Sequence, residues 1–177
     1  DYPELNFHNM KVVLIEAGPE LLGSMSPESK SHALKYLQEL GVDVMLNTQV
    51  KDYDGQIVSL SDDVFLETQT LLWAAGIKPN LIDGLSLEHY APSGRIYVDS
   101  YSQIIDCPGV YALGDVSLLT EERYPKGHPQ VAQVALQQAE RLANNLIDAQ
   151  KGKALKPFRY KNLGSMATIG KKRAVVD

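Results

Sequence analysis

Two acidic residues in this 177-residue chain stand where ligand chemistry is expected. Glu16 ends the run from Lys11 to Ile15, which is apolar from Val12 on, and Asp115 follows Gly114 and the run from Val110 to Leu113. We predict that both runs are buried strands of an open α/β sheet, in which ligands bind outside the carboxyl ends of the strands. A carboxylate there accepts hydrogen bonds from ligand hydroxyls, whereas burying it unpaired is costly. The alternatives without a ligand are a strand followed by an Asp-capped turn for Asp115, and a solvent-facing acid at a strand end for Glu16.

The first third of the chain has the pattern of a strand–helix–strand unit. Ser26-Pro27-Glu28 predicts a helix start, because it combines a cap, a first-turn proline and an acid at the positive helix end. Apolar residues follow at helical spacing up to Gly41, and Val42 to Leu46 is predicted to be the next, parallel strand. In dinucleotide folds, an acid placed like Glu16 binds the ribose hydroxyls of NAD and repels the 2′-phosphate of NADP.

The pattern changes over residues 49–72. Short apolar runs separated by turn residues such as Asp54-Gly55 predict an antiparallel meander. Leu71 to Gly76 is then predicted to be a buried strand, with the small residues Ala75 and Gly76 where a backbone must approach a cofactor. Further strands are predicted at 94–99 and 158–160, and a hairpin at 164–176.

A long helix is predicted from Gln130 to Gln150. Gln130, Gln133 and Gln137 recur on one stripe at spacings of three and four, which on a generic helix is a solvated face. The helix start would offer exposed N–H groups and a positive dipole end to a negative ligand. The expected apolar face comprises Val131, Ala132, Ala135, Ala139, Leu142, Ala143 and Leu146.

Composition excludes several classes of function. The net charge of −5 argues against a nucleic-acid surface. A single cysteine, Cys107, excludes an internal disulfide framework and a CxxC pair, and without a neighbouring histidine we interpret it as structural. His128 is also interpreted as structural. No apolar run approaches the roughly 18 residues of a membrane helix, and no signal-peptide pattern opens the chain, so we expect a protein of a reducing compartment.

Two motifs resemble those of a known family. The stretch Val110-Tyr111-Ala112-Leu113-Gly114-Asp115 resembles the second flavin-binding motif of flavoproteins with two dinucleotide-binding domains. The stretch Ala132-Gln133-Val134-Ala135-Leu136-Gln137-Gln138 resembles the AQxAxQQ helix of type II NADH dehydrogenases. These are single-subunit NADH:quinone oxidoreductases of the FAD-dependent pyridine nucleotide-disulfide oxidoreductase superfamily. Ala139 departs from the glycine usual in the family. The resemblance covers nearly the whole chain.

The resemblance implies a set of flavin-binding residues. Gly114 and Asp115 would contact the ribityl and pyrophosphate side of FAD. Gln130, Val131 and Ala132 would direct the helix N-terminus at the isoalloxazine, where it stabilises negative charge on a reduced flavin.

The resemblance also implies residues for the two substrates. Glu16 would hold the ribose of NADH, and Ala75 and Gly76 would mark the crossing from the nicotinamide domain to the flavin domain. Gln133 and Gln137 would line a quinone pocket beside the flavin. Hydride would pass from NADH to FAD and electrons to quinone, with no catalytic acid, base or metal ligand from this chain.

The expected architecture is α/β and incomplete. We expect a partial NAD(H)-binding domain at 1–77, the returning segment of the FAD-binding domain at 78–150, and the start of a C-terminal β-containing domain at 151–177. Because the Gly-rich cradles of both cofactors are absent, we expect a carboxyl-proximal fragment that is inactive alone. Unpaired sheet edges favour homo-oligomers. The family's later helices would attach the intact enzyme peripherally to the cytoplasmic face of the cell membrane.

Three alternatives remain. A sulfide:quinone reductase needs a pair of reactive cysteines, and this chain has one. A ferredoxin-type NADH reductase lacks the glutamine helix. An inert folded fragment would bind no cofactor.

Overall fold

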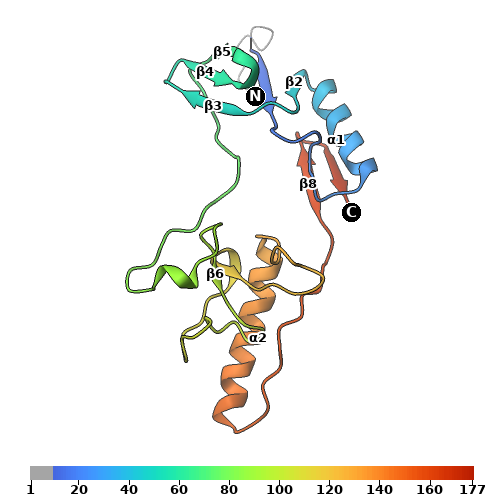
Figure 1. Ribbon diagram of the computed structural model, residues 1–177. Helices are drawn as coiled ribbons and strands as arrows, with labels where there is room; N and C mark the ends of the chain where they lie inside the picture. Colours follow the sequence, from blue (N-terminus) through green and yellow to red (C-terminus); the bar gives the residue numbers. More distant parts are fainter. Residues whose placement is uncertain (1–9) are drawn as a thin grey trace. The chain divides into compact units, whose positions relative to one another are not determined.

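The structure is a computed structural model that describes residues 10–177. The described chain forms two compact units (Figure 1). The first unit comprises the described part of residues 1–73 together with 164–177, and the second unit comprises residues 74–163. Residues 1–9, where the expected NAD(H)-binding segment begins, lie outside the described residues.

The first unit contains the predicted strand–helix–strand motif. β1 (Val12–Ile15) and β2 (Val42–Met45) pair in parallel, and α1 (Pro27–Glu39) connects them. The helix begins where the sequence predicts, because the side chain of Ser26 accepts a hydrogen bond of 3.3 Å from the N–H of Ser29. This part of the fold is therefore confirmed.

The antiparallel meander of the first unit is also confirmed. β3 (Val50–Tyr53), β4 (Ile57–Leu60) and β5 (Phe65–Glu67) form a three-stranded sheet in chain order. Asp54 fixes the first turn, since its Oδ1 accepts hydrogen bonds of 2.8 and 2.6 Å from the N–H groups two and three residues ahead. The same two bonds lower the pKa of the Asp54 carboxyl group.

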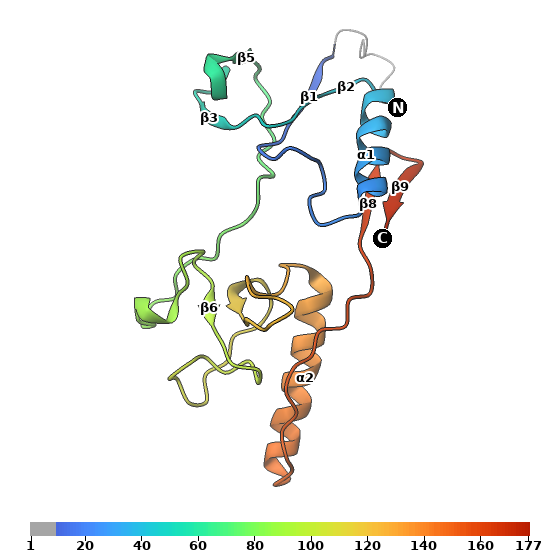
Figure 2. The ribbon, with the colours of Figure 1, turned by 45° about the vertical axis from the view of Figure 1, so that its right-hand side comes forward.

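The predicted hairpin near the end of the chain packs on α1. β8 (Met166–Ile169) and β9 (Arg173–Val176) pair antiparallel and lie beside α1 in Figures 1 and 2. Residues 164–177 group with the first unit, and the expected start of a C-terminal domain at 151–177 stays a prediction. The physical reason is a shared apolar core, whose buried members are Met25, Ala33, Ile169 and Val175.

The second unit is built around one long helix and little sheet. β6 (Ile96–Tyr97) pairs in parallel with β7 (Ser117–Leu118), and α2 (Ala132–Gln150) follows. The strand predicted at 94–99 is thus reduced to two residues. The core consists of Ile96, Val98, Ile104, Ala112, Leu119, Val134 and Phe158. As a whole the chain has the predicted mixed α/β fold. No helix within residues 10–177 is long and apolar enough to cross a membrane.

The strand expected from Leu71 to Gly76 is wrong. These residues form no regular structure, and the side chains of Leu72 and Trp73 are 87% and 65% exposed. A buried strand needs neighbouring strands on its edges, and none of the described strands pairs with this segment. Small and apolar residues therefore did not suffice to predict burial here.

The strand expected from Val110 to Leu113 is wrong as well. Val110 is half exposed, and only Tyr111 forms an isolated bridge, to Gln103. The segment makes its backbone hydrogen bonds with a nearby loop, as from the N–H of Ala112 to the carbonyl of Ser102 at 3.0 Å. Residues 158–160 likewise form no strand.

Helix α2 packs through a different face from the expected one. Ala132, Ala139 and Ala143 are exposed and Leu146 is 44% exposed, whereas the buried side chains are Val134, Gln138 and Asn145. Gln138 and Asn145 are amides, and they can be buried because their side chains bind backbone groups of neighbouring segments. Apolar spacing alone could not identify a packing face that is partly polar.

Amide side chains of α2 hold the segment that runs back along the helix. Asn145 donates to the carbonyl of Lys156 at 2.9 Å and accepts from its N–H at 3.0 Å. Gln137 makes the same two bonds with Lys161, at 2.9 and 3.0 Å. These pairs replace the ladder that a neighbouring strand would supply.

We predict that Asn145→Ala destabilises the second unit by about 2–4 kcal/mol, because it leaves the N–H and C=O of Lys156 without partners beside a buried site. Urea unfolding should measure the loss, and hydrogen exchange at the Lys156 amide should accelerate with it. The matched control is Asn144→Ala on the exposed side of the same turn, expected to change stability by less than about 0.5 kcal/mol. Equal stability of the two variants would contradict the clamp.

Candidate functional site

Glu16 lies at the carboxyl end of β1, as predicted. Its N–H donates to the carbonyl of Met45 at 2.9 Å, which continues the β1–β2 pairing. Its Oε1 accepts a 2.7 Å hydrogen bond from the N–H of Gly18, and a Cβ on Gly18 would come within 3.2 Å of that oxygen. The carboxylate is half-buried and held in place. This geometry suits an acceptor for ligand hydroxyls.

Gly114 and Asp115 lie in a 3₁₀ turn, η4 (Gly114–Val116), that packs against α2. Gly114 has φ +69°, and a Cβ there would lie 3.2 Å from the Cβ of Ala135. Its N–H donates to Oε1 of Gln138 at 2.7 Å. Glycine is therefore required both for the backbone conformation and for the close approach of the helix.

The start of α2 meets the same turn. Nε2 of Gln130 donates to the backbone carbonyl of Asp115 at 3.1 Å. Val131 is the N-cap residue and makes no side-chain capping bond, and the first turn of the helix carries no acidic residue. The structure thus brings Gly114, Asp115, Gln130, Val131 and Ala132 into one region of the second unit, where the positive end of α2 favours an anion.

Gln133 and Gln137 are half-buried and contact backbone. Oε1 of Gln133 accepts a 3.0 Å hydrogen bond from the N–H of Leu163, and Gln137 pairs with Lys161 as described above. The two residues therefore fix residues 161–163 along the first turns of α2.

Gln138 is a functional candidate that sequence reasoning missed. Its side chain is only 2% exposed, and it holds Gly114 in place. The available signal was its position four residues after Val134 and seven before Asn145, which places all three on one helix face. That face is buried.

Ala75 and Gly76 occupy an exposed, irregular segment of the second unit. Gly76 has φ +95°, and a Cβ there would point into open space. Gly76 thus has a backbone conformation that favours glycine, and neither residue is closely packed; the expected approach of this backbone to a cofactor stays a prediction.

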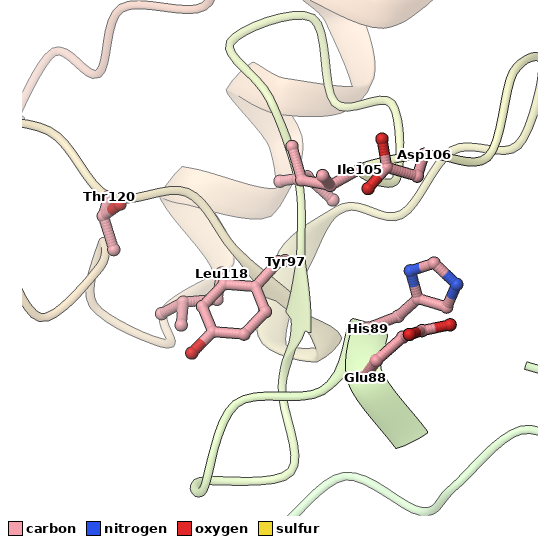
Figure 3. Close-up of a pocket in the computed structure, with 8 residues that line it drawn as sticks. Glu88, His89, Tyr97, Ile105, Asp106, Leu118 and Thr120 are labelled. Carbon is pink, nitrogen blue, oxygen red and sulfur yellow. The ribbon is translucent and has the colours of Figure 1, made fainter. Parts of the chain in front are cut away.

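A shallow pocket of about 430 Å³ lies elsewhere in the second unit (Figure 3). Tyr97 and Leu118, which face each other across β6 and β7, form part of its wall, and Glu88, His89 and Asp106 add polar groups. None of the predicted site residues lines it. Next to it, Sγ of Cys107 lies 3.6 Å from Nε2 of His89, so the expectation that this cysteine has no neighbouring histidine is wrong in three dimensions. The contact is made across 18 residues of sequence.

His128 is buried to 1% exposure among aromatic rings. Its Nε2 lies 2.6 Å from Oε1 of Glu121, while Nδ1 has no hydrogen-bond partner among residues 10–177. Burial lowers the pKa of His128 below its usual value; Glu121 offsets part of this shift, and the positive charge of Arg95 adds to it. The surrounding rings belong to Tyr124, Phe158 and Tyr160.

The acid at the end of β1 and the glycine–aspartate turn at the start of α2 define an α/β protein of the nucleotide-cofactor-binding class. Residues 4–139 match the pyridine nucleotide-disulphide oxidoreductase family. The chain belongs to that family. This confirms the resemblance drawn from the motifs, and FAD and NAD(H) are the cofactors that the membership implies. Among residues 10–177, no three His, Cys, Asp or Glu side chains are grouped to hold a metal ion.

Two similar proteins of known name are NAD(P)H:quinone oxidoreductases. The chain is 29% identical over 164 residues to a type II NADH:quinone oxidoreductase from Staphylococcus saprophyticus, a match that covers 91% of this chain and 40% of the relative. It is 32% identical over 181 residues to the mitochondrial internal alternative NAD(P)H-ubiquinone oxidoreductase A1 of Arabidopsis thaliana, covering 96% of this chain and 35% of the relative. The chain therefore spans well under half the length of these relatives.

Solved structures show the same fold. NDH2 from Plasmodium falciparum in complex with NADH matches with a TM-score of 0.83 at 18% identity, over 97% of this chain and 50% of that one. A ferredoxin reductase from Rhodopseudomonas palustris matches with a TM-score of 0.67 at 21% identity, over 86% of this chain and 38% of that one. At these identities the likeness concerns the fold.

We predict that His128 makes the protein sensitive to mild acid. Burial in the folded protein lowers the pKa of His128 below its usual value of 6.5. As the pH falls below 6.5, the unfolded chain therefore binds more protons than the folded protein, and the folded protein loses stability. Above that pH, His128 is neutral in both states and causes no such loss of stability. Melting temperatures near pH 7.5 and near pH 5.5 should differ less in His128→Gln than in the wild type.

The control for this prediction is His32→Gln, because His32 is exposed. It should keep the wild-type difference between the two pH values. An unchanged acid dependence in His128→Gln would show that burial of this histidine does not control the response.

Proposed function

We propose that this chain serves in a flavoprotein that transfers hydride from NADH to FAD and passes the electrons to a quinone. The observation that carries the proposal is the packing of the Gly114–Asp115 turn on the first turns of α2, joined by the bonds of Gln130 and Gln138. The names of the curated relatives support the same reaction.

The residues present fit FAD. The turn at Gly114 brings backbone close to α2, the Asp115 carboxylate is half-buried beside it, and the helix start has no acidic side chain to repel an anion. In the proposed arrangement Asp115 accepts hydrogen bonds from hydroxyl groups of the cofactor. Gln130, Val131 and Ala132 place the positive helix end beside it.

The residues at the end of β1 fit NAD(H). Glu16 would accept hydrogen bonds from the ribose hydroxyls, and its charge would disfavour a 2′-phosphate. Ala75 and Gly76, which leave space for close approach, would border the cofactors at the crossing between domains.

When bound, FAD supplies the redox chemistry of the reaction. The chain's own residues bind and orient the cofactor, and no side chain is needed as a general acid or base. Gln133 and Gln137 contribute to the quinone site by holding residues 161–163 against α2, so that this segment forms a wall of the site.

Membrane attachment and self-association stay predictions. The proposed protein would sit on the cytoplasmic face of the membrane. β1 and β2 form a two-stranded sheet among the described residues, which leaves strand edges open to a second copy.

The test is made on the purified protein at its natural full length. We expect it to bind FAD, which is detected by the flavin absorbance at about 450 nm. We also expect it to oxidise NADH with a soluble quinone. Asp115→Asn should weaken FAD binding by about tenfold or more, because an amide is a poorer acceptor than a carboxylate. Asp106→Asn, an exposed aspartate of the same unit, is the matched control.

A wild-type protein that neither retains flavin nor oxidises NADH would overturn the proposal. The isolated 177-residue chain is expected to show no NADH oxidation even with added FAD. Turnover by that chain would show instead that the cradles absent from it are dispensable.

We predict that Gln137→Leu raises the KM for quinone about three- to tenfold, because loss of both bonds to Lys161 frees the wall segment. Reduction of the bound flavin by NADH, followed by stopped-flow absorbance, should stay unchanged. Gln150→Leu at the exposed end of α2 is the control. An unchanged KM with weakened flavin binding would place Gln137 in the cofactor site instead.

A further inference from the structure

Arg95 is a buried cation that the proposed function does not yet use. Its side chain belongs to a residue only 8% exposed, directly before β6. Nε donates to the carbonyl of Ser117 at 2.8 Å, and Nη2 donates to the carbonyl of His128 at 3.2 Å. Burying a guanidinium is costly unless its donors are satisfied, so an apolar residue would fill this space more cheaply.

The two carbonyls belong to the two segments that build the proposed flavin site. Ser117 ends the turn that carries Gly114 and Asp115, and its Oγ donates to the carbonyl of Gly114 at 3.0 Å. His128 lies in the lead-in to α2, two residues before Gln130. Arg95 therefore joins, through one planar group, segments that the hydrogen bonds of Gln130 and Gln138 also connect.

The lead-in packs closely against Leu118 and the guanidinium at Gly127. Gly127 has φ +83°, and a Cβ at this position would overlap the side chain of Leu118 and lie 3.2 Å from Nη1 of Arg95. Glycine lets the backbone press against both groups. Asp115 also interacts electrostatically with Arg95: it raises the pKa of the guanidinium and offsets part of the lowering caused by burial.

We propose that Arg95 is a positioning residue for the flavin, which fixes the Asp115 turn against the lead-in of α2 and adds a fixed positive charge beside that turn. The inference rests on the proposed function and deepens it. Lysine keeps the charge of arginine but lacks its planar fork, so it cannot hold both carbonyls in the same way. Methionine removes the charge and all donors while it retains a long side chain.

The test uses the full-length protein with its flavin removed and re-added. FAD titration gives the dissociation constant, and redox titration of the bound flavin gives its reduction potential. Arg95→Lys should weaken FAD binding about three- to tenfold with the wild-type potential. Arg95→Met should weaken it about tenfold or more and move the potential to more negative values, because a cation that stabilises the reduced anion is lost.

Arg159→Met, at an exposed arginine of the same unit, should change neither quantity. The inference is overturned if Arg95→Lys binds FAD like the wild type, which decides the matter even if Arg95→Met does not fold. It is also overturned if Arg95→Met folds and keeps the wild-type potential. In either case a wild type that binds FAD leaves the proposed function standing, whereas a wild type without flavin overturns both.

Discussion

The 2.7 Å hydrogen bond from the N–H of Gly114 to Oε1 of Gln138 is the contact on which the second unit depends. It is made by a side chain that is almost fully buried, so breaking it would leave an amide group without water or partner. Gly114 allows it, because its φ of +69° favours glycine and a Cβ there would lie only 3.2 Å from the Cβ of Ala135. The bond thereby gives the Asp115 turn and the start of α2 a common frame, and a site assembled from both inherits its geometry.

Side-chain hydrogen bonds do in this unit what strand pairing does in a larger sheet. Its paired strands are two residues long, and polar side chains satisfy many of the backbone groups in its loops. Oδ1 of Asp99 accepts from the N–H groups of Tyr101 and Gln103 at 2.8 and 2.9 Å. Asn145 and Gln137 do the same for the returning segment. The Asp99 bonds hold a single loop, whereas those of Asn145 and Gln137 join α2 to a segment 11 and 24 residues away.

This explains which parts of the fold could be predicted from the sequence. The turn at Asp54 and the capping bond between Ser26 and Ser29 depend on residues within three positions, so a local pattern contains them. The bonds of Ser26 and Ser29 to the Asp177 carboxylate, about 150 residues away, have no such local signature. The strand expected at Leu71 to Gly76 depends on neighbours that a local pattern does not contain. An apolar run is a condition for a buried strand, and a partner strand is the other.

The same distinction applies to the candidate site. The glycine–aspartate motif and the glutamine helix are contiguous stretches, and the sequence sufficed to select Gly114, Asp115 and Gln130, which the structure brings together. Arg95 and the contact between Cys107 and His89 carry no local signature, because their partners lie 18 to 33 residues away. Gln138 was visible within the motif, but its burial depends on how the helix packs.

The charges around the site follow from burial. The chain as a whole is acidic, with a net charge of −5, yet Arg95 and the positive end of α2 both lie by the Asp115 turn. Burial lowers the pKa of His128; Glu121 opposes this shift and Arg95 adds to it. A guanidinium stays charged throughout the neutral range, whereas an imidazole titrates within it. The fixed positive charge beside the Asp115 turn therefore comes from a group whose charge does not vary with pH, and burial is the main reason that the pKa of the neighbouring histidine is low.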